Sequence, residues 1–381
     1  MASVAKNRVT RKSSAAKPIG SAPCYGQTVL VLHGGGALGA YQAGVYQAMH
    51  EAGIEPDWVI GTSIGAINGA IIAGNPPEQR LARLHAFWDG VKHQAPDFAP
   101  LAWLGLGPVL SNMQTVTTGI PAFFEPNPAA MMGNKAQLGV DQASYYSTEP
   151  LRETLNAMVD FACLSQKKTR LTVGAVHVRG GDMRYFDSRE ESLGVEHVMA
   201  SGALPPAFPA VRVNGEPYWD GGIYSNTPIE AVLDDRPRRN STIFAVNVWQ
   251  PTGPEPQSIW DVMGRQKEIQ FASREDSHIE RQKQIHRLRR VIRELQQYVP
   301  DDKKDDPRVK ELASWGCGTT MHVLRLLAPR IDGEDYTKDI DFSAGAINAR
   351  WKAGYKDTLA MIKRAPWEGL ADSIEGVVVH D

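Results

Sequence analysis

The order of hydrophobic and polar positions predicts two consecutive strand–turn–helix units near the start of the chain. Residues 28–32 and 58–60 are uninterrupted runs of apolar or β-branched side chains, which is typical of strands buried on both faces. Residues 40–49 and 66–74 follow them with apolar and small side chains that predict helices. Each unit therefore has a sharp turn between a buried strand and the N-terminus of a helix.

The pattern predicts further elements up to residue 248. Turn signals at 179–182 and 214–215 predict two β-hairpins. Residues 96–130 are rich in Pro, Gly, Asn and aromatic side chains, so we expect an apolar loop region or lid there. The large side chains in and just after it could line an acyl-chain pocket or belong to the core: Trp103, Phe123, Phe124, Met131 and Met132. The other predicted elements are helices over 81–91, 149–162 and 195–203 and strands over 171–178, 184–187, 211–213, 216–219 and 242–248.

The character of the chain changes in its last third. Residues 251–256 resemble a linker, and residues 258–299 predict one long amphipathic helix with a basic face. The apolar stripe of this helix consists of Ile285, Leu288, Ile292 and Leu295. The helix could pack on the core, contact an anionic membrane surface or associate with a second copy of the chain. A strand over 319–327 and a last helix that begins after Ser343 complete the prediction.

Composition narrows the class of protein. The 381-residue chain is 42% hydrophobic, which suits one large domain or two small ones. It carries 41 basic and 43 acidic side chains, and the resulting net charge of −2 gives no reason to expect a nucleic-acid partner. Cys24, Cys163 and Cys317 have neither metal-site spacing nor the pattern of a disulfide framework, which favours a reducing, cytoplasmic location. No motif indicates a cofactor or a metal ion.

We expect residues 1–24 to form a disordered basic tail. The first twenty residues contain five Lys or Arg side chains and no acidic one, and they lack the apolar core of a signal peptide. No stretch of the sequence approaches the roughly 20 apolar residues of a transmembrane helix. Any contact with a membrane or a lipid-body surface is therefore expected to be peripheral.

The turn of the first unit, residues 33–39, is rich in glycine. Its backbone N–H groups, at a helix N-terminus, could bind a negatively charged oxygen. Gly34, Gly36 and Gly39 also fit the dinucleotide-binding pattern. That pattern needs an acidic residue at the end of the second strand, where this chain has the serine turn Gly61–Gly65 instead. The other interpretations are an oxyanion hole and a turn that serves only close packing. A serine turn in the next unit favours the oxyanion hole.

The second turn, residues 61–65, holds Ser63 between two glycines. A Gly-x-Ser-x-Gly turn between strand and helix presents a serine hydroxyl as a nucleophile, which needs an adjacent base. Asp220 stands at the end of a predicted strand before two glycines, where another loop can approach closely. The histidines after Asp220 lie in no glycine-flanked loop at a strand end, so they do not indicate a triad. His33, beside the first turn, is the histidine to examine.

These motifs, in this order, resemble those of the patatin-like phospholipases. The matching stretches are Gly34–Gly39, Gly61–Gly65, Ala200–Pro205 with Phe208–Val211, Asp220–Gly222 and Asn226–Pro228. The resemblance covers about residues 25–250. Residues 341–343 and 350–355 resemble the C-terminal extension of a bacterial subgroup of this family. Many bacterial members carry Arg or Lys where this chain has Leu38, which weakens the expectation of a contact with a phosphate headgroup.

The resemblance implies an α/β fold, a three-layer α/β/α sandwich with a mainly parallel central sheet. It also implies a division of the chain into three parts. The tail at 1–24 is followed by a catalytic domain at 25–250. Residues 251–381 then form a helical extension with one added strand, packed on the catalytic domain.

The resemblance also implies the chemistry. Ser63 is expected to be the nucleophile and Asp220 the base of a Ser–Asp dyad. Backbone N–H groups of Gly34, Gly35, Gly36 and Ala37 are expected to form the oxyanion hole. We therefore predict a lipid acyl hydrolase of the phospholipase A type that needs no cofactor. The alternatives are an esterase for a non-phospholipid substrate, such as a hydroxyalkanoate polyester or a thioester, and a catalytically inert lipid-binding or scaffold protein.

Overall fold

A computed structural model describes most of the chain. The described residues are 26–92, 115–133, 135–166, 168–272, 275–332, 334–369 and 374–381. The predicted basic tail at 1–24 and Trp103 lie outside them. None of the described helices is both long enough and apolar enough to cross a membrane.

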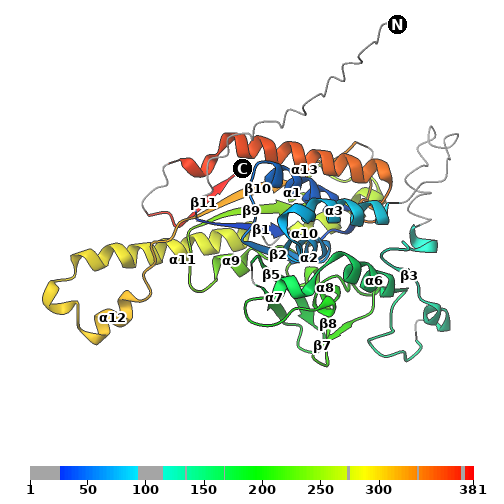
Figure 1. The fold of residues 1–381 in the computed structure, drawn as a ribbon, viewed down its shortest axis with the longest axis horizontal. Helices are drawn as coiled ribbons and strands as arrows, with labels where there is room; N and C mark the ends of the chain where they lie inside the picture. The colour runs from blue at the N-terminus through cyan, green and yellow to red at the C-terminus, as the bar shows by residue number, and fades with distance from the viewer. Residues whose placement is uncertain are drawn as a thin grey trace, which may run out of the picture.

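A nine-stranded sheet forms the centre of the molecule (Figure 1). The strands are β1 (Gln27–Leu32), β2 (Trp58–Thr62), β5 (Arg170–His177), β6 (Met183–Asp187), β7 (Val211–Val213), β8 (Glu216–Asp220), β9 (Ser241–Asn247), β10 (Met321–Leu327) and β11 (Val377–His380). Their order is β11-β10-β9-β1-β2-β5-β8-β7, and β6 also pairs with β5. The strands from β11 to β5 run parallel to their neighbours, whereas β6 and β8 run antiparallel to β5. The predicted mainly parallel sheet is confirmed.

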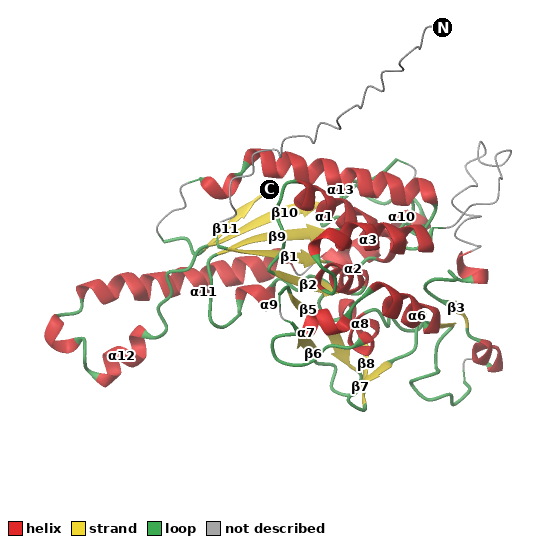
Figure 2. Cartoon of the chain, viewed as in Figure 1, coloured by secondary structure: helices red, strands yellow, loops and turns green. Residues whose placement is uncertain are grey.

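The two faces of the sheet are covered by different helices, as the alternation along β1 shows. Leu30 and Leu32 belong to one apolar cluster, with residues of α1 (Ala40–Glu51), α2 (Ile64–Ala73), α3 (Pro77–Val91) and α13 (Ala344–Arg364). Val29 and Val31 belong to another, with residues of α9 (Glu230–Leu233) and α11 (Glu275–Leu295). Successive side chains of a strand point to opposite faces, so the sheet is buried on both sides. Figure 2 shows the resulting three-layer arrangement that the family resemblance implied.

The predicted elements differ from the structure in three places. Instead of one helix over 149–162, the chain forms α6 (Glu149–Met158) and α7 (Phe161–Ser165), because the Asp160 side chain caps α7 by accepting the N–H groups of Ala162 and Cys163. The segment 258–299 contains α10 (Ile259–Ala272) and α11, on either side of the undescribed residues 273–274. The C-terminal third adds two strands, β10 and β11, where the pattern predicted one. β11 is only four residues long, and it forms by pairing with β10.

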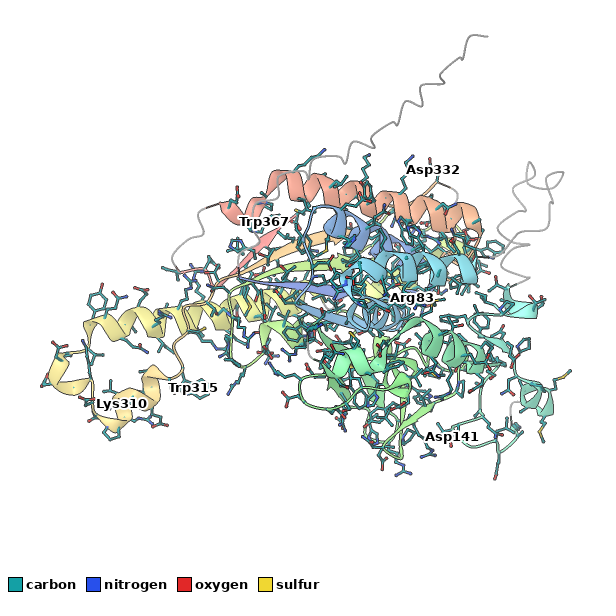
Figure 3. The ribbon with its side chains drawn as sticks, viewed as in Figure 1. Arg83, Asp141, Lys310, Trp315, Asp332 and Trp367 are labelled. Carbon is teal, nitrogen blue, oxygen red and sulfur yellow. The ribbon has the colours of Figure 1, made fainter. Side chains whose placement is uncertain are left out.

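The second half of α11 extends away from the sheet and forms an arm with α12 (Pro307–Ala313), shown in yellow at the left of Figure 1. Figure 3 labels Lys310 and Trp315 on this arm. Ile279, near the start of α11, is 2% exposed, whereas Leu288 and Leu295 are 64% and 59% exposed. In the apolar stripe itself, the two leucines are therefore exposed, whereas Ile285 and Ile292 are half-buried. Self-association and membrane contact through residues 258–299 stay predictions.

Helix α13 of the C-terminal extension is in very close contact with α1, the helix that follows the first glycine turn. A Cβ atom on Gly44 of α1 would lie 1.9 Å from the carbonyl oxygen of Trp351 on α13. A Cβ atom on Gly354 would lie 2.0 Å from the carbonyl oxygen of Tyr41. The helix backbones thus meet at two glycines, and no side chain fits between them.

We predict that Gly354→Ala lowers the free energy of unfolding by about 1–3 kcal/mol, because an added methyl group must push α1 and α13 apart. Gly345→Ala is the matched control on the same helix, since a Cβ atom there meets nothing within 4 Å. The control should leave stability unchanged or raise it by up to about 1 kcal/mol. Urea denaturation followed by circular dichroism measures both, and equal effects would contradict the close contact.

Candidate active site

Ser63 lies at a sharp turn between β2 and α2. Its backbone has φ 57° and ψ −126°, a conformation that is unfavourable for a residue with a side chain. The Ser63 N–H donates to the carbonyl oxygen of Ser201, at 3.1 Å, and to the Ser201 hydroxyl, at 3.0 Å. Cβ atoms on Gly61 and Gly65 would each lie 2.3 Å from a backbone carbonyl oxygen, so the turn requires both glycines. The chain therefore has the sharp strand–turn–helix geometry that the sequence predicted, and the role of Ser63 as a nucleophile stays a prediction.

Asp220 ends β8, and the topology of the sheet brings it to Ser63. β5 lies between β2 and β8. Its residue Gly174 is opposite Thr62, and its residue Ala175 is opposite Asp220. The Asp220 side chain is buried, accepts the Gly222 N–H at 2.7 Å and accepts a hydrogen bond from the Ser63 side chain. Two residues separated by 157 positions therefore meet across one intervening strand.

Burial of Asp220 changes its proton affinity. Removal from water raises the pKa of the carboxyl from 3.8 to about 6, although the hydrogen bonds from Ser63 and the Gly222 N–H act in the opposite direction. A carboxylate with this pKa is a stronger base than an ordinary aspartate and is still mostly ionised at neutral pH. The arrangement can therefore take a proton from the neighbouring hydroxyl.

The first glycine turn lies directly against Ser63. A Cβ atom on Gly34 would be 3.0 Å from the Cβ of Ser63. The Gly34 carbonyl accepts from the indole N–H of Trp249, at 2.8 Å, and from the amide of Asn226, at 3.1 Å. These bonds hold the turn through its carbonyl group and do not involve its N–H groups.

The predicted donors of the turn differ in availability. In the described part of the chain, the N–H groups of Gly34, Gly35 and Gly36 have no hydrogen-bond acceptor, and all three residues line the cavity beside Ser63. The Ala37 N–H is different, because it donates to the carbonyl oxygen of Asp339 at 2.8 Å. In this structure Ala37 therefore has no N–H to offer an oxyanion, contrary to the expectation from the resemblance.

Ser63 and Asp220 open into a cavity of about 180 Å³ with mainly apolar walls. Its large side chains are Ile64, Ile67, Phe123, Phe124, Tyr146, Phe208, Trp249, Phe271, Ile340 and Phe342. Among the described residues that line it, the charged side chains are Asp220 and Asp339, and no Lys or Arg is present. Phe123 and Phe124 thus belong to the core and to the cavity wall, whereas Met131 and Met132 are 91% and 72% exposed and line neither.

No histidine is found among the described residues that line the cavity. His33 is fully buried, its Nδ1 lies 3.5 Å from the Thr227 hydroxyl, and burial lowers its pKa to about 3, so the ring is neutral. The His286 ring bonds to the carbonyl oxygen of Leu233 at the end of α9. Nowhere in the described ranges do three or more His, Cys, Asp or Glu side chains group closely enough to hold a metal ion.

Sequence analysis gave no site role to Ser201, Trp249 or Asp339. Ser201 orients the N–H of Ser63, Trp249 holds the Gly34 carbonyl, and Asp339 occupies the Ala37 N–H. Each acts on a residue at least 138 positions away through a contact made only in the folded chain. Ser201 lies in the motif stretch Ala200–Pro205, which assigned it no role, and no local signal marks Trp249 or Asp339 in the sequence.

Two models of known protein families match this chain. A family model described as patatin-like phospholipase matches residues 30–233, which is more than half of the chain. A second family model, described as patatin phospholipase, matches residues 269–373. The two matches cover the first units with the serine turn and most of the C-terminal extension.

Curated relatives match part of the chain. "Lysophospholipase NTE1" of Candida glabrata is 29% identical over 241 residues, or 62% of this chain and 11% of the relative. "Patatin-like phospholipase domain-containing protein 6" of Mus musculus is 40% identical over 94 residues, 24% of this chain and 6% of the relative. The chain thus spans about a tenth or less of the length of these relatives. Among solved structures, VipD from Legionella pneumophila matches at 14% identity with a TM-score of 0.37, covering 90% of this chain and 68% of VipD.

We predict that Asp220 makes the folded protein less stable as the pH rises from about 4 to about 6. The pKa of this carboxyl is raised in the folded state, so the folded protein binds the proton more tightly than the unfolded chain and loses that advantage through this pH range. Asp220→Asn should therefore gain about 2 kcal/mol of stability relative to the wild type between pH 4 and pH 7.

Urea denaturation of both proteins across this pH range measures the difference. Asp332→Asn, which replaces a solvent-exposed carboxylate (Figure 3), is the control and should show no such trend. A difference between Asp220→Asn and the wild type that does not change with pH would contradict the raised pKa.

Proposed function

The chain belongs to the patatin-like phospholipase family, and on that premise we propose that it is a serine hydrolase of lipid-like acyl esters. Ser63 is the nucleophile and Asp220 is the base. One observation carries the proposal: the Ser63 hydroxyl, on its strained turn, bonds to a buried carboxylate of raised pKa beside an apolar cavity. An activated serine and a space for an acyl chain are the two requirements of this reaction.

The reaction proceeds in two steps, acylation of Ser63 and hydrolysis of the acyl-enzyme. As Ser63 Oγ attacks the ester carbonyl carbon, its proton passes to Asp220 and the carbonyl oxygen becomes an oxyanion. Collapse of this intermediate breaks the bond to the alcohol oxygen, which takes the proton from Asp220, and leaves the acyl group on Ser63. Water then attacks the acyl group in the same way, with its proton passing through Asp220 back to Ser63, and releases the carboxylic acid.

The oxyanion is stabilised by the glycine turn. The N–H groups of Gly34, Gly35 and Gly36 are the donors, since the Ala37 N–H is bonded to Asp339. Removal of one such donor in a serine hydrolase typically lowers kcat by a factor of about 10²–10³. The proximity of Gly34 to the Cβ of Ser63 supports this placement of the hole.

The cavity favours an uncharged, apolar acyl group. An apolar cavity of about 150 Å³ is large enough for benzene, so a cavity of about 180 Å³ suits part of a hydrocarbon chain. Its described walls offer two carboxylates and no cation, and Leu38 is buried among apolar residues instead of lining it. A phosphate close to the scissile bond would find no positive partner on these walls. This observation favours a neutral ester as a second candidate beside the phospholipid esters that the family suggests.

We predict that Ser63→Ala and Asp220→Asn each lower kcat/KM toward a short-chain aryl ester by a factor of at least about 10³, because each removes one half of the nucleophile–base pair. Ser63→Ala should also abolish labelling by a fluorophosphonate, which reacts only with an activated serine. Ser192→Ala, a change on a surface loop outside the cavity, is the control. Full activity in either variant would refute the Ser–Asp dyad. A wild type that neither cleaves the ester nor reacts with the fluorophosphonate would support an inert lipid-binding protein.

A substrate panel tests the headgroup. With acyl length held constant, we expect monoacylglycerol to be cleaved with a kcat/KM at least about tenfold above that of lysophospholipid, since the described walls offer a phosphate no cation. Phospholipid and hydroxyalkanoate oligomers complete the panel. Faster release from the phosphate-bearing substrates would contradict the neutral-ester preference while leaving the proposed reaction intact.

A further inference from the structure

The segment Tyr336–Phe342 crosses the first glycine turn. It lies between β10 and α13, in the C-terminal extension, and its residues Asp339, Ile340 and Phe342 line the cavity. The carbonyl oxygen of Asp339 accepts the Ala37 N–H at 2.8 Å. A Cβ atom on Gly36 would lie 2.3 Å from the same oxygen, so the two backbones are in direct contact. The extension therefore forms part of the site.

α10 holds this segment in place through its side chains. The ammonium group of Lys267 lies 2.8 and 3.0 Å from the two carboxylate oxygens of Asp339 and donates to the carbonyl oxygen of Tyr336 at 3.1 Å. The next residue of α10, Glu268, pairs with Lys338 at 2.7 Å, and both side chains are buried. Two neighbouring side chains of α10, Lys267 and Glu268, thus bind two neighbouring residues of the segment.

The segment is built as a fixed wall. Breaking one partner of a buried ion pair leaves the other charge unpaired and buried, which is unfavourable. Phe342 is 3% exposed, and its ring centroid lies 6.2 Å from that of Phe123 across the cavity. The guanidinium of Arg350 bonds to the Asp341 carbonyl and to Glu334, and so holds the segment from α13 as well. These contacts favour a permanent structural role at the turn over the role of a lid that opens.

We infer that Asp339 is a positioning residue for the reaction at Ser63, and that Lys267 acts through it. The Asp339 carbonyl fixes Ala37, and Ala37 fixes the orientation of the neighbouring Gly35 and Gly36 N–H groups toward the oxyanion. The inference rests on the proposed function. Its physical basis is that donors stabilise an oxyanion only when they are placed in advance, and a displacement of about 1 Å can cost 10²-fold in rate.

The test is a set of kinetic constants for variants at the Lys267–Asp339 pair. Lys267→Met removes the ammonium group, and Asp339→Ala removes the carboxylate while keeping the backbone carbonyl. With the short-chain aryl ester, each should lower kcat by a factor of about 10–100 and change KM by less than about threefold, because the substrate still binds while the oxyanion donors are misplaced. Lys267→Arg keeps a cation and should recover at least a third of wild-type kcat. The double variant should be no slower than the slower single variant, since both changes act on one contact.

Lys283→Met is the matched control, because Lys283 is as exposed as Lys267 and pairs, among the described residues, only with a neighbour on its own helix, Glu280, at 3.0 Å. Its kcat should stay within about twofold of the wild type. An unchanged or raised kcat in Lys267→Met overturns the inference. A raised value would mean that the segment Tyr336–Phe342 inhibits the reaction. If Lys267→Met does not fold, Asp339→Asn decides the question, because it also removes the ion pair and should lower kcat by a factor of about 10–100, whereas an unchanged kcat overturns the inference. A wild type inert toward the ester and the fluorophosphonate refutes the proposed function itself, whereas an active wild type with insensitive variants refutes this inference alone.

Discussion

The burial of a carboxylate beside a serine hydroxyl is the constraint on which the rest of the site depends. Removal from water raises the pKa of Asp220, and this carboxyl lies where β2, β5 and β8 run side by side and glycines allow a close approach. A Cβ atom on Gly221 would lie 2.5 Å from the Gly174 carbonyl oxygen, and one on Gly61 would meet Gly65. The glycines at these positions allow the backbones beside Ser63 and Asp220 to pack closely.

The C-terminal extension is tied to the glycine turn at two levels. Helix α13 lies against α1, whose N-terminus follows the turn, through backbone contacts at Gly44 and Gly354. The segment before α13 then reaches the turn itself through the bond from Ala37 to Asp339. Residues matched by two separate family models therefore form one hydrophobic core and one cavity wall.

The cavity and the arm lie at opposite ends of the parallel strands. Ser63 follows the C-terminal end of β2, where parallel α/β sheets generally carry their sites. The arm returns to the sheet at the N-terminal end of β10, and Cys317 bonds to Arg289 as it does so. The basic face of α11 is thus remote from Ser63 and Asp220. The described cavity walls carry two carboxylates and apolar rings.

The sequence alone determined the strand–turn–helix units, the serine between two glycines and the aspartate at a strand end. These features depend on hydrophobic period and on glycine within a few residues, so they are visible locally. The tertiary structure alone decided that β5 places Asp220 beside Ser63, that Asp339 takes the Ala37 N–H, that Ser201 and Trp249 support the turns, and that β11 is a strand. Each of these depends on groups brought together from more than 40 positions apart, and such contacts leave no hydrophobic period in the chain.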